Sequence, residues 1–339
     1  MAEATRTGHA APAALARDDS WLSLHVFYHG NLDRLLCAVI PPLRADLAAG
    51  GLADDLFFLR YWEGGNHVRL RARPRSPERA DEVARLMRAH AERYLAGHPS
   101  PSVQGDADYT QLAAVLSAGE RRAGYAPRLY PNNSVAALPY LSETERYGDG
   151  RSLAAVERHF VESSDLAIGV LAEDTGPARR AHLAFTLILL TWLIAEPSVR
   201  RLAAATVAVA AEPGARFGVG RAEFVGLTRR LRDVAGRLRA TPPADPGLPA
   251  RQASWSSSVL ALRDDLAGEI AAGRFTPPEY GWRGPAGLRG EPGDTRALPV
   301  LDLCAHLVCN RLGVPIPEEG GLRHLAAHAV AAVVEEEGR

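Results

Sequence analysis

Lysine is absent from the 339-residue sequence, so all 39 Lys/Arg positions are arginines. This absence excludes Schiff-base chemistry on a lysine and a lysine that binds phosphate. The arginines are balanced by 40 acidic residues, and the net charge of −1 argues against a general binder of nucleic acid or membrane surfaces. Because the chain is also rich in alanine, its arginine content fits the codon bias of a GC-rich genome and carries little weight by itself.

Cysteine is also scarce. Cys37, Cys304 and Cys309 have no CxxC spacing, which supports neither a zinc site nor a disulfide framework, and no metal site is expected. No P-loop and no GxGxxG at a strand–helix junction is present, so no cofactor is expected.

Long hydrophobic segments are missing as well. The longest apolar run, residues 181–195, is interrupted by His182 and is shorter than the roughly 20 residues of a membrane-spanning helix. The first residues do not form a signal peptide. We therefore expect no membrane span and a cytoplasmic protein.

What the chain does contain is enough apolar sequence, 47%, for a large core. Residues 1–19 predict a disordered tail, because they are polar and alanine-rich. Residues 21–28 and 57–73 predict strands, and most of the later segments have helical spacing. We thus predict an α+β fold, mostly helical with an N-terminal antiparallel sheet. It forms a single domain over residues 20–339, with a Pro-rich loop at 241–249 and a Gly/Pro-rich loop at 275–298.

The helical segments follow from apolar periodicity and capping signals. Two consecutive prolines, Pro41 and Pro42, are expected to break the helical stretch 32–47 into two pieces. Further helices are expected at 76–95, 109–123, 152–164, 165–171, 177–195, 198–211, 221–239, 255–272, 298–312 and 321–337.

Residues 57–73, FFLRYWEGGNHVRLRAR, predict a hairpin. The EGGN segment is a turn, because two glycines and an asparagine tolerate positive φ. The second strand alternates strictly, which puts His67, Arg69, Arg71 and Arg73 on one face. Guanidinium groups on a rigid strand suit bidentate binding of carboxylates. An exposed edge strand with solvated charge is the competing interpretation.

Two other clusters contain side chains that can take part in chemistry. Residues 143–148, ETERYG, combine carboxylates and an arginine at the end of an extended segment, either as a pocket lining or as a surface salt-bridged turn. His306 and Asn310 share one face of the last clear amphipathic helix, predicted at 298–312. His306 is either a proton shuttle or a core histidine with its hydrogen bonds satisfied.

Together these clusters match a family. The segments WLSLHVFYHGNLDRLL, FFLRYWEGGNHVRLRAR, YLSETERYG and HLVCNRLG resemble the C-terminal domain of lantibiotic dehydratases, in the form called the thiopeptide-type bacteriocin biosynthesis domain. The resemblance runs from about residue 21 to 328. One departure is Asp149, where the family more often has a second glycine, and only a loop effect is expected from it.

The resemblance implies an elimination module for a ribosomally synthesised peptide. Such a module expels glutamate from a glutamylated Ser or Thr of the precursor peptide and leaves dehydroalanine or dehydrobutyrine. It implies two partners, the precursor peptide and a separate tRNA-dependent glutamylating dehydratase, without direct binding of nucleic acid. The family's functional positions fall on Arg69 and Arg71 of HVRLR, Glu143 and Arg146 of ExxRYG, and His306 of HxxxNRL.

Five neighbours of these positions are expected to contact the substrate: Tyr61, His67, Tyr147, Asn310 and Arg311.

Two other functions remain open at this point. The same family includes stand-alone pyridine synthases of thiopeptide pathways, which join two dehydroalanines by a formal [4+2] cycloaddition and lose water and the leader peptide. All five functional positions are present, which favours the lyase, since a cycloaddition has no glutamate to bind. A non-catalytic subunit that binds the precursor peptide is disfavoured, because burying unpaired arginines without a function is costly.

Overall fold

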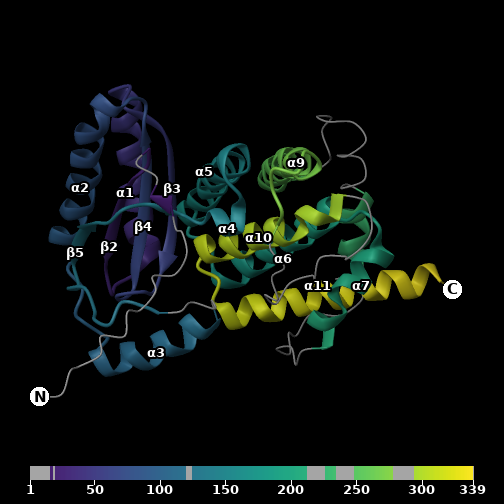
Figure 1. Cartoon of the computed structure of the whole chain (residues 1–339). Helices are drawn as coiled ribbons and strands as arrows, with labels where there is room; N and C mark the ends of the chain where they lie inside the picture. The colour runs from purple at the N-terminus through teal and green to yellow at the C-terminus, as the bar shows by residue number, and fades with distance from the viewer. Residues whose placement is uncertain are drawn as a thin grey trace, which may run out of the picture.

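The computed structural model describes residues 16–17, 20–119, 124–211, 226–233, 248–277 and 294–338. A four-stranded antiparallel sheet lies beside a large assembly of helices (Figure 1). The sheet order is β3-β4-β2-β5, formed by Ala53–Tyr61, His67–Pro74, Leu22–Phe27 and Ser134–Ala137. A two-residue strand β1, Ala16–Arg17, pairs with β6, Leu141–Ser142. The predicted α+β class is thereby confirmed.

The described helices follow in chain order. They are α1 (Leu32–Ala49), α2 (Ala80–Gly97), α3 (Asp106–Gly119), α4 (Thr144–Tyr147), α5 (Gly150–Ala172), α6 (Pro177–Ala195), α7 (Val199–Ala211), α9 (Ala250–Ala271), α10 (Leu298–Leu312) and α11 (Ile316–Glu337), with short 3₁₀ helices at Pro77–Arg79 and Asp294–Ala297.

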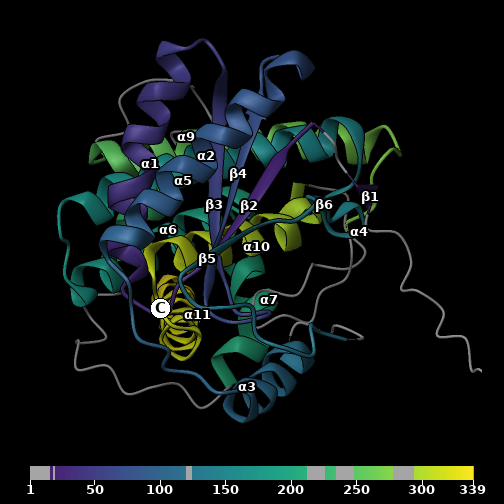
Figure 2. The same ribbon diagram turned by 90° about the vertical axis from the view of Figure 1, so that its left-hand side faces the viewer.

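The two faces of the sheet differ because side chains alternate along each strand. The apolar face, which includes Val26, Val68 and Leu70, belongs to the hydrophobic core, and α1 and α2 cover it. Figure 2 shows these two helices in front of the strands. The opposite face carries the arginines of β4, and this alternation agrees with the sequence prediction.

Helix α6 lies at the centre of the helical assembly, against α9, α10 and α11 (Figure 1). Every residue from Ala184 to Ala195 is buried. Its length and apolar composition would also suit a membrane span, but 72% of the apolar window is buried inside the fold. We therefore interpret α6 as a core helix, as its sequence predicts.

The prediction that Pro41 and Pro42 break the first helix was wrong, because α1 runs through both. Each proline removes one backbone donor, but both are exposed, so water can reach the carbonyls that lose a partner. The buried residues on both sides, including Leu36, Ile40 and Leu43, hold the helix against the sheet. Tertiary packing outweighs the local cost.

A second correction concerns residues 152–171, which form one helix, α5, rather than two. Ser163 and Ser164 lie at the expected break, but their hydroxyls donate to the carbonyl of Phe160 within the helix. Serine hydroxyls that bond back in this way leave the helix intact.

Several predictions fall wholly or partly outside the described residues. Most of the 1–19 tail, the 241–249 loop and the 275–298 loop are in this group, as are parts of the predicted helices at 109–123 and 221–239. Within the last of these, residues 226–233 are helical.

Strand β3 is an edge of the sheet, and side chains from the helical assembly bind its outward backbone groups. The Asn310 amide clamps Arg60, accepting from its N–H at 2.9 Å and donating to its carbonyl at 2.9 Å. Two residues earlier, Phe58 donates its N–H to Ser164 Oγ at 3.2 Å and accepts from Arg311 Nε at 3.0 Å. These bonds attach α5 and α10 to the sheet and satisfy an otherwise open edge.

We expect Asn310→Ala to lower the free energy of unfolding by about 2–4 kcal/mol, because it leaves two backbone groups of Arg60 without partners. The matched control is Asn66→Ala, which removes an exposed asparagine with a single bond, from Nδ2 to the Tyr28 carbonyl at 3.2 Å. That control should cost about 0.5–1 kcal/mol. Urea unfolding measures both, and equal costs would contradict the clamp.

Candidate active site

The polar face of β4 is the first part of the site. Strand pairing places His25 of β2 opposite Arg69 and Phe57 of β3 opposite Arg71. His67 and Arg71 are buried, whereas Arg69 is half-buried. The guanidinium groups of Arg69 and Arg71 are therefore held largely in the interior, and β4 is an inner strand rather than the exposed edge strand of the competing interpretation.

Two neutral histidines lie beside these arginines. The rings of His25 and His67 stack with centroids 4.9 Å apart. Burial lowers the pKa of His25 to about 2, and Arg69 adds to this by repulsion. Burial likewise lowers the pKa of His67 to about 3. His67 Nδ1 donates to the Gly65 carbonyl at 2.8 Å, which leaves Nε2 as a buried acceptor.

Arg69 is held by an aromatic ring and a carboxylate. Its guanidinium carbon lies 3.4 Å from the ring centroid of Tyr61, a close cation–π contact. Its Nη2 lies 3.4 Å from Glu63 Oε2, a long ion pair. Tyr61, predicted to contact the substrate, is thus also the residue that orients Arg69.

Arg71 is buried deeper. Its guanidinium carbon lies 4.5 Å from the Tyr140 ring and 5.3 Å from the Phe57 ring. Burial lowers the pKa of Arg71 to about 10, and repulsion from Arg69 adds to the effect. Tyr140, Glu143 and the buried Glu157 act on this pKa in the opposite direction. Its Nε is buried without a hydrogen-bond partner.

The ETERYG segment forms the short helix α4. Glu143 precedes this helix, and its Oε2 lies 2.7 Å from Arg146 Nη1. Gly148, at φ 74°, ends the helix, and a Cβ there would lie 2.8 Å from the Phe275 ring. Tyr147 is buried, and its pKa is raised well above the usual range, first by burial and then by Glu143. The segment therefore combines a buried tyrosine with a partly exposed ion pair, whose side chains are 30% and 38% exposed.

The predicted residues near the end of the chain divide into two roles. Asn310 has both amide atoms bound to the β3 backbone. Arg311 is fully buried, its Nε binds the β3 backbone, and its Nη atoms have no hydrogen-bond partners. Burial lowers the pKa of Arg311 to about 10. Both residues hold α10 against the sheet, and their contact with the substrate stays a prediction.

His306 lies one turn before Asn310 on α10. Its side chain is 17% exposed, and its Nδ1 lies 2.8 Å from Glu319 Oε2 of α11. Arg69 and Glu143 both influence the charge of Arg71, Glu143 pairs with Arg146, and His306 lies on the helix whose Asn310 binds the adjacent strand.

Sequence reasoning missed four residues of this region: His25, Tyr140, Glu157 and Glu319. His25 lies in a predicted strand, and its pairing with Arg69 was accessible only once the strand order was known. Tyr140 lies in a segment without periodicity, and Glu157 is a buried carboxylate on α5 that influences Arg71. Glu319 is 13 residues from His306 on a different helix, so no spacing indicates it.

A family comparison decides the class of protein. The sequence matches the family described as the C-terminal part of the lantibiotic biosynthesis dehydratase over residues 21–330. This chain belongs to that family. Membership of this family places the protein among the enzymes that modify ribosomally made precursor peptides during antibiotic biosynthesis. Among curated proteins, no relative matches the sequence.

Three solved structures share the fold of this protein. The pyridine synthase TbtD from thiomuracin biosynthesis superposes with a TM-score of 0.72 at 21% identity, covering 94% of this chain and 100% of TbtD. TsrL superposes with a TM-score of 0.60 at 17% identity, covering 93% of this chain and 95% of TsrL. The tRNA-dependent lantibiotic dehydratase MibB from Microbispora sp. 107891 superposes with a TM-score of 0.54 at 19% identity, covering 98% of this chain but 29% of MibB.

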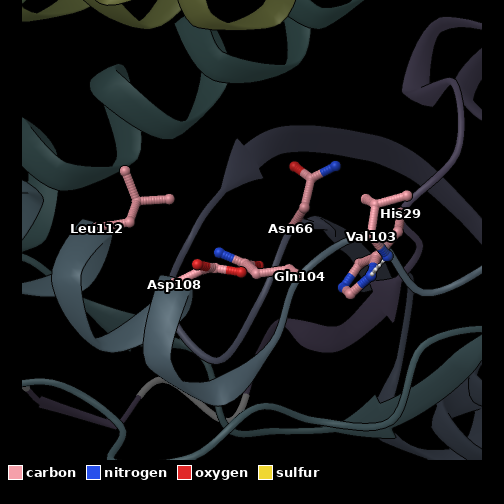
Figure 3. A pocket seen from close by; sticks show the side chains of 6 residues that line it. All are labelled: His29, Asn66, Val103, Gln104, Asp108 and Leu112. Atoms are coloured by element: carbon pink, nitrogen blue, oxygen red, sulfur yellow. Dashed lines mark hydrogen bonds between the residues drawn. The ribbon is translucent and has the colours of Figure 1, made fainter.

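A surface pocket of about 350 Å³ lies at the turn end of the same hairpin (Figure 3). Its lining is His29, Asn66, Val103, Gln104, Asp108 and Leu112, which includes none of the predicted site residues. Within the described residues, no group of three or more His, Cys, Asp or Glu side chains could hold a metal ion.

The buried neutral histidines predict acid sensitivity. Because the folded pKa of His25 lies below its unfolded value of 6.5, the unfolded state binds the proton first, and stability falls as the pH drops below about 6.5. Between pH 6 and 4, we expect the free energy of unfolding of His25→Gln to fall less steeply than that of the wild type, by about 1.4 kcal/mol per pH unit. Urea unfolding across that range measures it, with the exposed His182→Gln as control. If the free energy of unfolding depends on pH with the same slope in wild type and His25→Gln, the neutral state of His25 in the folded protein is refuted.

Proposed function

We propose that this protein eliminates glutamate from glutamylated serine and threonine residues of a precursor peptide, giving dehydroalanine and dehydrobutyrine. A separate tRNA-dependent glutamylating enzyme supplies the ester. The observation that carries the proposal is Arg71, a buried guanidinium with an unpartnered Nε, beside Arg69 and the Glu143–Arg146 pair. Glu143 and Glu157 offset part of the cost of burying this cation, and an anionic group of the substrate would offset more.

The reaction makes the anion that such a site stabilises. A base removes the Cα proton of the modified residue, and the electron pair forms the Cα=Cβ double bond. The Cβ–O bond breaks, and glutamate departs as a carboxylate with the bonding electrons. Two guanidinium groups on a rigid strand bind a carboxylate at fixed geometry, and low dielectric strengthens the attraction as charge develops.

The remaining residues have supporting roles. Glu143, 2.7 Å from Arg146, orients that guanidinium toward the reacting group. The neutral rings of His25 and His67 add polarity without adding positive charge. His306 carries the proton, and Glu319, 2.8 Å from its Nδ1, holds the ring in place.

Arg71→Ala should lower the rate of glutamate release by at least about 100-fold, since it removes a charge that acts on the departing carboxylate. The matched control is Arg73→Ala on the same face of the strand, where the guanidinium is already bonded to Asp55 and is 40% exposed. The control should stay within about threefold of wild type. Mass spectrometry of a glutamylated precursor peptide measures both, together with Arg71→Lys as a variant that keeps the charge. Equal rates for the two alanine variants would contradict the proposal.

Pyridine synthesis is the second candidate, because the fold overlaps TbtD over nearly the full length of both chains. In that reaction two dehydroalanines join by a formal [4+2] cycloaddition, and water and the leader peptide are lost. Incubation with an already dehydrated precursor peptide separates the candidates. Macrocycle formation without glutamate release would favour the synthase. Tight peptide binding without change in either substrate would favour a non-catalytic peptide-binding subunit.

A further inference from the structure

A buried carboxylate lies behind the arginine face of the sheet. It belongs to Glu157 of α5, which is 3% exposed, and α5 packs against β3. Phe160, three residues later and on the same side of the helix, has its ring centroid 5.5 Å from that of Phe57. Phe57 is the cross-strand partner of Arg71, and its ring centroid lies 5.3 Å from the Arg71 guanidinium carbon. The helix therefore carries Glu157 at its contact with this part of the sheet.

Tyr140 connects Glu157 to the arginine. Its ring centroid lies 4.5 Å from the Arg71 guanidinium carbon, and its hydroxyl forms a side-chain hydrogen bond with Glu157. An ionised carboxylate can only accept, so the phenol is the donor. The ring is buried and lies edge-on to Trp21 and Phe57, with centroids 6.2 Å and 6.1 Å away. The ring is thus fixed in place, and its hydroxyl holds the carboxylate near Arg71.

Two carboxylates act on Arg71, and they differ in their surroundings. Burial lowers the pKa of Arg71 to about 10, and the carboxylates of Glu143 and Glu157 oppose this effect. Glu143 is partly exposed and is already paired with Arg146 at 2.7 Å. Solvent and the partner cation therefore weaken the field of Glu143 at Arg71 more than that of the buried Glu157.

We propose that Glu157 is a positioning residue whose charge limits the affinity of Arg71 for anions, so that the glutamate product can leave the site. This inference rests on the proposed function. The group that departs and the free product carry the same carboxylate, so guanidinium groups that stabilise the first also retain the second. A fixed negative charge beside Arg71 weakens that retention, which matters because product release often sets the turnover rate.

Glu157→Gln tests the assignment, because glutamine keeps the size of the side chain and still accepts from Tyr140, but has no charge. Calorimetric titration of the peptide-free protein with L-glutamate measures the affinity. We expect the dissociation constant of glutamate to fall at least about fivefold in the variant, since the attraction to Arg71 is no longer opposed. Loss of structural support alone would weaken binding, so the sign of the change separates the two roles.

Glu162→Gln is the matched control. It removes the same charge from the same helix, but Glu162 lies five residues later on a different side of α5 and accepts from Ser258 of α9. We expect its dissociation constant for glutamate to stay within about twofold of wild type. Unchanged or weaker binding in Glu157→Gln, equal shifts in the two variants, or no measurable glutamate binding to any of the proteins would overturn the proposal.

Tyr140→Phe provides a second measurement that does not depend on the folding of Glu157→Gln. The phenylalanine keeps the ring but removes the hydroxyl, so the carboxylate of Glu157 loses its donor and is drawn to Arg71. We expect the dissociation constant of glutamate to rise about threefold, the opposite direction to Glu157→Gln. An unchanged or lower dissociation constant in Tyr140→Phe would contradict the role of Glu157.

The two proposals fail in different ways, because the titration needs no glutamylated peptide. If Glu157→Gln binds glutamate more tightly but the wild-type protein releases none from a glutamylated precursor peptide, the proposed function is contradicted and the effect of Glu157 on the site stands. If the wild-type protein releases glutamate but Glu157→Gln binds it no more tightly, the role of Glu157 is contradicted and the proposed function stands.

Discussion

The attachment of α10 to the open edge of β3 determines where the functional groups of this protein lie. Edge strands normally leave every second backbone N–H and carbonyl without a partner. Here the Asn310 amide and Arg311 Nε fill those positions at Arg60 and Phe58, and Ser164 completes them from α5. Together with the hydrophobic core that joins β3 to α5 and α10, these bonds fix the helix that carries His306 relative to the arginine face of the sheet.

The site that results is rich in buried positive charge. Arg71 and Arg311 are both buried, and burial lowers the pKa of each to about 10. The histidines beside the arginines do not add charge, because burial and the arginines keep His25 and His67 neutral. In the proposed elimination, the anionic group of the substrate would offset the cost of burying these guanidinium groups.

How much of this could be predicted from the sequence depends on the range of the interaction. The β4 alternation is a local pattern of period 2, so the shared face of Arg69 and Arg71 was predicted correctly. The continuous helix through Pro41 and Pro42 was missed, because packing against the sheet decides it. The backbone clamp of Asn310 and the bond between His306 and Glu319 join distant elements, which no spacing rule reaches.

The central claim is that the arginine face binds the glutamyl group that leaves. The most direct measurement is a crystal structure with a precursor peptide in which an amide replaces the labile glutamyl ester. The account predicts the glutamyl carboxylate within about 3 Å of the Arg69 and Arg71 guanidinium groups, with His306 Nε2 facing the Cα of the modified residue. A glutamyl group bound elsewhere, for example in the pocket lined by His29 and Asp108, with the arginine face empty, would contradict it.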